Sequence, residues 1–98
     1  MMEHTAQISN RGGRWRLYVV LMGVPVLHWP EHHFGPSPTV PTAAERSRVL
    51  AWFGFVAVDG AEWGWTEDNE TYGDDTSPVL LLASIPVRPA GPADGGAA

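Results

Sequence analysis

The segment VLLLASIPV, residues 79–87, is apolar on both of the faces that a β-strand presents. Successive side chains of a strand point to opposite sides of the sheet, and an antiparallel sheet with one face in water alternates apolar with polar residues. Because this run does not alternate, we expect it to form a strand in a sheet that is covered on both faces.

One helix is predicted before this strand, over residues 42–53. Thr42-Ala-Ala-Glu45 fits a capping box, in which the Thr hydroxyl and the Glu carboxylate each accept a hydrogen bond from the other residue's amide. Apolar residues such as Leu50 and Phe53 recur at helical spacing, and Gly54 is well placed to end the helix. A helix of three turns covers only one face of a sheet.

Two strands are predicted ahead of the helix. Residues 14–22 alternate at period two, and residues 24–29 return as a short edge strand. Residues 30–41 contain four prolines and a glycine and are expected to form a loop.

After the helix, two short apolar runs flank Asp59-Gly60. Strands over 55–58 and 61–65 would then form a hairpin, and the alternative is one long strand with a bulge at Gly60. Residues 66–77 are acidic and rich in turn residues, and we expect a loop there.

The chain is therefore predicted to be one small α+β domain over residues 14–88. It combines an antiparallel sheet of four to five strands with a single helix, about residues 42–53, packed on one face. The tails, residues 1–13 and 89–98, are polar or rich in Gly, Ala and Pro and are expected to be disordered. The predicted core comprises Trp15, Leu17, Val19, Leu21, Leu50, Phe53, Val56, Val58, Trp63, Leu80 and Leu82.

The sheet face without the helix needs a second cover. A symmetric homodimer through this helix-free face is our expectation, because two-fold dimers are the commonest closed assemblies. The alternative is that the loop over 30–41 folds across the face together with Trp29 and Phe34.

Composition excludes several classes of function. The chain has no cysteine, which rules out disulfides and thiolate metal sites. Its net charge of −5 argues against a general nucleic-acid binder and against attraction to anionic membranes. The apolar run over 17–27 is far shorter than the ~20 residues of a membrane span. No nucleophile elbow, P-loop or dinucleotide-binding motif is present, so neither an enzyme nor a cofactor is expected.

The leading functional hypothesis is a non-catalytic interaction or regulatory module. Residues 49–87 contain seven acidic residues and no basic one, and two tryptophans two positions apart face the same way beside them. If exposed, they would form a contact surface for a basic protein partner. If buried, they are core residues beside a solvated loop. The candidate interaction residues are Trp63, Trp65, Glu62, Glu67 and Asp68.

A nucleic-acid-associated protein is the first alternative. Arg11, Arg14, Trp15 and Arg16 mix arginines with an aromatic residue, as proteins that bind single strands do. Three arginines are few for a grip on phosphates, and the acidic segment opposes one.

A metal-binding protein is the second alternative. The candidate ligands are His28, Glu31, His32 and His33, within the stretch HWPEHH. Pro30 prevents a continuous helix that would align His28 with His32, so these residues could converge on an ion only in an irregular loop.

Three stretches resemble one protein family: TVPTAAERSRVLAWFGFVAVDGAEWGWTE at 39–67, GRWRLYVVL at 13–21 and WPEHHF at 29–34. The family consists of short proteins of unknown function from high-GC actinobacteria, with P-T-x-x-E-R before a helix and then G-A-E-W-x-W-x-E. The resemblance covers roughly residues 10–88. It implies no activity, cofactor or catalytic residue, and it suggests a cytoplasmic bacterial protein.

Overall fold

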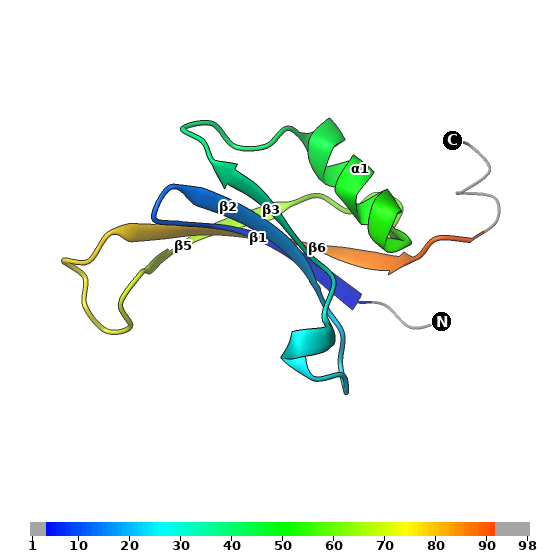
Figure 1. Cartoon of the computed structure of the whole chain (residues 1–98), viewed down its shortest axis with the longest axis horizontal. Helices are drawn as coiled ribbons and strands as arrows, with labels where there is room; N and C mark the ends of the chain where they lie inside the picture. The colour runs from blue at the N-terminus through cyan, green and yellow to red at the C-terminus, as the bar shows by residue number, and fades with distance from the viewer. Residues whose placement is uncertain (1–3, 92–98) are drawn as a thin grey trace.

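The computed structural model describes residues 4–91 and contains six strands, one α-helix and one short 3₁₀ turn. In chain order these are β1 (His4–Arg11), β2 (Arg14–Val20), η1 (Val26–His28), β3 (Glu31–Pro36), α1 (Ala43–Phe53), β4 (Phe55–Ala57), β5 (Gly64–Asn69) and β6 (Val79–Pro89). The strands form one antiparallel sheet in the order β3-β2-β1-β6-β4, and β5 also pairs with β6. α1 lies on one face and η1 on the opposite side (Figure 1). The predicted α+β class, with one helix on an antiparallel sheet, is confirmed.

The helix has the local structure that its sequence predicts. The amide of Glu45 donates to the Thr42 hydroxyl at 3.1 Å, and the amide of Thr42 donates to the Glu45 carboxylate at 2.9 Å. Gly54 follows in the left-handed conformation, with φ of 88°. Its amide donates back to the carbonyls of Leu50 and Ala51, which closes the last turn.

β4 and β5 follow the same edge of β6, which corrects the predicted hairpin. Phe55 is paired with Pro89, and Gly64 is paired with Ser84, so both strands run antiparallel to β6. Between them the amide of Val58 donates to the Pro86 carbonyl at 3.0 Å, and that of Ala61 donates to the Val58 carbonyl at 2.9 Å. Residues 58–63, which include Gly60, lie between two separate strands, so the alternative prediction of one long strand with a bulge at Gly60 is not confirmed either. Because both segments pair with β6, they supply hydrogen-bond partners along this edge of β6, which a hairpin between the two segments would have left open.

Residues 4–11 form the central strand β1, so the prediction of a disordered tail over 1–13 is wrong for them. β1 pairs with β2 on one side and with β6 on the other. Ala6 and Ile8 are fully buried on the helix side. These two apolar residues, alternating with polar ones, are enough to hold β1 in the centre of the sheet, because its two neighbouring strands supply the rest of the apolar surface.

The turn between β1 and β2 consists of Gly12 and Gly13. Both have positive φ, at 59° and 78°, which suits a tight two-residue hairpin turn. Most of the predicted C-terminal tail, residues 92–98, lies outside the described residues.

The segment after β2 differs from the prediction of a strand over 24–29. The Trp29 indole N–H donates to the carbonyls of Leu21 and Val24, at 3.1 and 2.9 Å, and folds the segment into a loop with η1 at its tip. β3 then occupies part of the predicted loop over 30–41, at the sheet edge where Pro36 is tolerated. β5 likewise extends into the predicted acidic loop.

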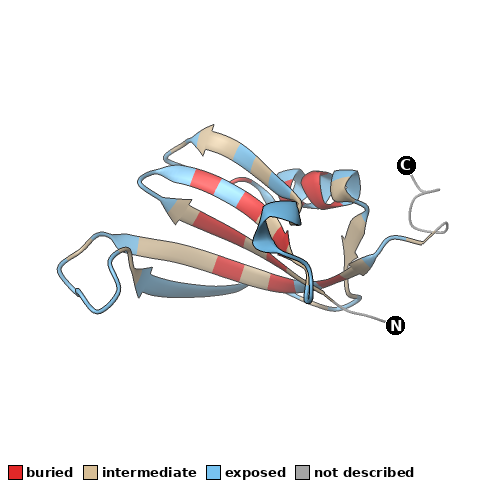
Figure 2. Cartoon of the chain, turned by 60° about the horizontal axis from the view of Figure 1, so that its bottom comes forward, coloured by how far each residue is buried: buried red, intermediate tan, exposed pale blue. Residues whose placement is uncertain are grey.

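The core lies between α1 and the sheet (Figure 2). Its buried apolar residues are Ala6, Ile8, Trp15, Leu17, Val19, Val49, Leu50, Ala83, Ile85 and Val87. Of the predicted core, Trp15, Leu17, Val19 and Leu50 are buried, and Leu21, Phe53 and Trp63 pack around them half-buried. The prediction is wrong for Val56, Val58, Leu80 and Leu82, which occupy the helix-free face. A strand that is apolar on both faces does not reveal which set of alternate residues faces the helix.

Candidate functional site

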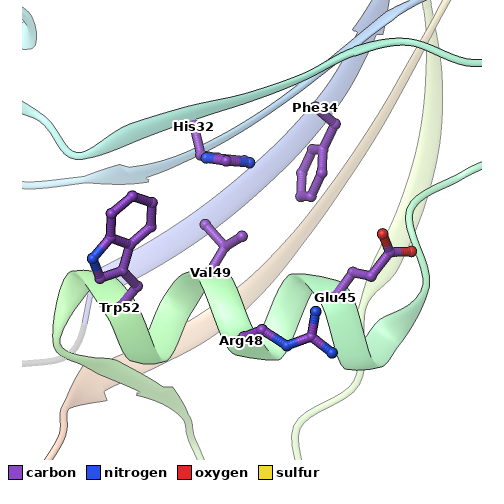
Figure 3. A pocket seen from close by; sticks show the side chains of 6 residues that line it. All are labelled: His32, Phe34, Glu45, Arg48, Val49 and Trp52. Carbon is purple, nitrogen blue, oxygen red and sulfur yellow. The ribbon is translucent and has the colours of Figure 1, made fainter.

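A groove of about 410 Å³ lies between α1 and the edge strand β3 (Figure 3). We call it the α1–β3 groove. It is lined by His32 and Phe34 from β3 and by Glu45, Arg48, Val49 and Trp52 from α1. A second cavity of about 280 Å³ continues past Phe34 and Glu45 along residues 37–42.

Two periodicities of the chain bring these side chains together. His32 and Phe34 are two positions apart in a strand, so both point to the helix side of the sheet. On α1, Arg48 and Val49 are three and four positions after Glu45, and Trp52 is four and three positions after them, which places all four along one side of the helix. The groove is therefore a product of regular structure on both of its walls.

Aromatic rings form one end of the groove. The His32 ring lies edge-on to Phe34 and to Trp52, with ring centres 4.8 and 6.2 Å away. The Val49 side chain lies between Phe34 and Trp52 (Figure 3), and Trp52 is 77% exposed. An accessible tryptophan beside an apolar hollow is typical of residues that dominate binding energies at protein interfaces.

Both signs of charge occur on the helix wall. Hydrogen bonds from the amide and hydroxyl of Thr42, with a smaller contribution from Arg48, hold the pKa of Glu45 below its usual value. Glu45 is therefore ionised at neutral pH and is engaged with the helix N-terminus. Arg48 is left as the cationic group that a ligand in the groove would meet.

β3 presents an open backbone edge beside the groove. Within residues 4–91 it pairs with β2 alone. The Pro30 carbonyl accepts from the amide of Val19 at 3.1 Å, which fixes the alternation of the ladder. The backbone groups of His32 consequently point toward β2, and those of Glu31 and His33 point toward the free edge.

The structure does not bring the predicted metal ligands together. His32 lines the groove, whereas Glu31 and His33 lie on the helix-free face, where their side chains contact each other and Arg16. His28 is exposed in η1. No group of three or more histidine or acidic side chains suited to a metal ion occurs in the described part of the chain.

The candidate nucleic-acid residues are also divided. Trp15 is only 2% exposed, and its indole N–H donates to the Ser37 carbonyl at 3.2 Å, so its ring belongs to the core and is not free to stack on a base. Arg11 and Arg14 are cross-strand partners at the exposed end of the β1–β2 hairpin. Arg16 lies 4.6 Å from the centre of the Tyr18 ring and contacts Glu31.

The predicted tryptophan–acid surface is only partly assembled. Trp63 and Trp65 do point the same way, but toward Arg46 on the helix, and Trp65 is also edge-on to Trp15. Trp63 is half-buried and Trp65 is 44% exposed. The acidic candidates Glu62, Glu67 and Asp68 are exposed, and the last two alternate between opposite faces of β5.

Sequence reasoning missed Arg48 and Trp52 as site residues. The available signal was that Trp52 adjoins the apolar stripe of the helix formed by Val49, Leu50 and Phe53 without belonging to it. Such a tryptophan is a candidate for an exposed contact.

These features define a small α+β protein with an aromatic groove beside an open sheet edge. No helix of the described residues is long and apolar enough to cross a membrane. The chain belongs to a family of unknown function, DUF6303, whose model matches residues 2–95. The predicted membership of a family of unknown function is thereby confirmed. Comparisons with curated proteins and with solved structures gave no match.

Proposed function

We propose that the chain is a non-catalytic interaction module that binds an extended strand of a protein in the α1–β3 groove. The observation that carries the proposal is the position of Trp52, 77% exposed, beside a hollow whose opposite wall is the edge strand β3. In strand addition, the backbone edge contributes affinity and pockets for alternate side chains contribute specificity.

The groove suits such a segment chemically. The outward backbone groups of Glu31 and His33 are in position to pair with an added strand. Every second side chain of that strand would then point toward α1. An apolar side chain on that face would lie over Val49 between Phe34 and Trp52, with Arg48 nearby.

The core does not require the exposed ring. Val49 and Leu50 are 8% and 2% exposed and hold α1 on the sheet. Removing the indole of Trp52 should therefore affect binding far more than folding.

A displayed library of random twelve-residue peptides tests the proposal. Peptides selected on the wild-type chain should bind Trp52→Ala at least ten-fold more weakly. They should bind Tyr72→Ala normally, because Tyr72 is 98% exposed in the loop after β5 and provides a matched aromatic control. Selected peptides that bind both variants equally, or a library that yields no binder on a chain that is monomeric in solution, would contradict the proposal.

The regulatory role, the basic partner and the cytoplasmic location expected from the sequence stay predictions. The proposal does not depend on any of them.

A further inference from the structure

Resting on this proposed function, we propose that the strand bound along β3 is β3 of a second copy. The two chains would form an isologous dimer with one continuous sheet. The edge sequence Glu31-His32-His33 is self-complementary in one antiparallel register, and that property points to a second copy of this chain rather than to an unrelated peptide.

A two-fold axis at His32 satisfies the backbone. Glu31, whose backbone groups point outward, lies opposite His33 of the partner subunit, whose groups also point outward. The two residues exchange both hydrogen bonds, and the symmetric pair repeats this on the other side of the axis. His32 faces His32 of the partner subunit as the closely spaced pair between the two hydrogen-bonded ones.

The same register matches the side chains on the helix-free face. Each Glu31 carboxylate comes beside an imidazole of the other chain, while Arg16, 3.7 Å from Glu31 within its own chain, adds positive charge. An imidazole N–H can donate a hydrogen bond to a carboxylate on the paired strand, whereas two carboxylates placed side by side repel each other and oppose pairing. A parallel arrangement in register would instead put Glu31 beside Glu31.

On the helix side, the two grooves would meet over the pair of His32 rings. A ladder of two residue pairs is too short to hold a dimer, since stable interfaces bury ~800 Å² on each partner. The groove walls must therefore supply most of the contact. Trp52 and Phe34 are the large side chains placed to do so.

The ends of β3 keep the pairing closed. The Pro30 carbonyl faces Val19 of β2, and Pro36, which ends the strand, carries no amide proton for further pairing. Because an isologous contact uses the same edge of both chains, the assembly stops at two copies.

The absence of cysteine allows a direct test of the axis. Cα atoms of a closely spaced antiparallel pair lie ~4.5 Å apart, within the reach of a disulfide. His32→Cys should therefore form a covalent dimer on mild oxidation. Glu31→Cys should not, because its two copies are offset by two residues along the strands. Leu27→Cys, at a position 94% exposed in the loop on the helix-free side, controls for random collision and for a dimer through that face.

Charge exchange tests the register without touching the groove. By light scattering after size exclusion, wild type should be a dimer, and His33→Glu should dissociate at least ten-fold more readily. The double variant Glu31→Lys with His33→Glu should recover much of the loss.

The outcomes separate this inference from the proposed function. A monomeric chain that still binds peptides through Trp52 overturns the dimer and leaves the proposed function intact. If the Leu27→Cys variant forms a cross-linked dimer on oxidation, or if His33→Glu leaves the dimer unchanged, pairing along β3 is overturned. Either result supports a dimer through the helix-free face, as predicted from the sequence.

Discussion

The guanidinium carbon of Arg46 lies 4.9 Å from the centre of the Trp63 ring, so a cation on α1 packs against an aromatic residue of the segment between β4 and β5. The same group lies 5.7 Å from the Trp65 ring. Its Nε donates to the carbonyls of Pro41 and Thr42, and its Nη1 is buried without a hydrogen-bond partner among the described residues. Burial lowers the pKa of Arg46 from its usual value.

Arg46 should stabilise the fold through packing more than through charge. Arg46→Ala removes the aliphatic stem and the ring contact, and we expect it to lower the free energy of unfolding by about 2 kcal/mol. Arg46→Met retains an unbranched stem and removes a buried donor without a partner, so its effect should stay within about 1 kcal/mol. Urea unfolding followed by tryptophan fluorescence measures both. Equal losses in the two variants would show that the hydrogen bonds dominate.

The capping box should make stability depend on acid pH through Glu45. The pKa of Glu45 is lower in the folded chain than in the unfolded one, chiefly because the Thr42 amide donates a hydrogen bond to its carboxylate. Between the folded and the unfolded pKa, the folded state therefore binds fewer protons than the unfolded state. The stabilisation is present above the unfolded value of about 4.3 and is lost as the pH falls through the folded pKa. Glu45→Gln should be less stable than wild type at pH 7, and the difference should shrink as the pH falls through the folded pKa of Glu45. A difference that stays constant with pH would exclude the carboxylate as its source.

The sequence predicts those parts of the fold that rest on local signals. Thr42, Glu45 and Gly54 mark the helix ends by their own hydrogen bonds and backbone conformation, and both ends are where the sequence places them. Strand partners depend instead on distant residues. Leu80 and Leu81 are equally apolar, and only pairing with β1 and β5 decides that Leu81 faces the helix.

The α1–β3 groove could not be predicted from the sequence for a similar reason. His32 and Trp52 are twenty positions apart, and neither sits in a motif. They meet because β3 is an edge strand and because α1 returns over it. The sequence offered the histidine stretch as a metal site only if it formed an irregular loop, and in the structure it forms the regular strand β3, which places His32 and His33 on opposite faces.

β1 should be indispensable to folding. Ile8 is fully buried, so Ile8→Ala should lower the free energy of unfolding by about 2–4 kcal/mol. Arg11→Ala is the control on the same strand, since Arg11 is exposed and its side chain makes a long hydrogen bond, 3.4 Å, to the Glu70 carbonyl. It should change stability by less than about 0.5 kcal/mol. Equal, small effects from both would contradict a central position for β1.

The loop over 21–30 should be held by Trp29 and not by its exposed apolar residues. The Trp29 indole lies nearly parallel to the Tyr18 ring, with centres 6.4 Å apart, and its N–H is shared by two backbone carbonyls. Trp29→Phe keeps a ring but removes the donor, so we expect a loss of about 1 kcal/mol. We also expect faster hydrogen exchange at the Val24 amide, which donates to the Leu21 carbonyl at 3.2 Å within this loop. Leu27→Ser should leave both unchanged in the single chain, because Leu27 is 94% exposed. If Leu27→Ser instead lowered stability to an extent that depends on protein concentration, the loop would lie in a dimer interface on the helix-free face, and the proposed dimer through β3 would be wrong.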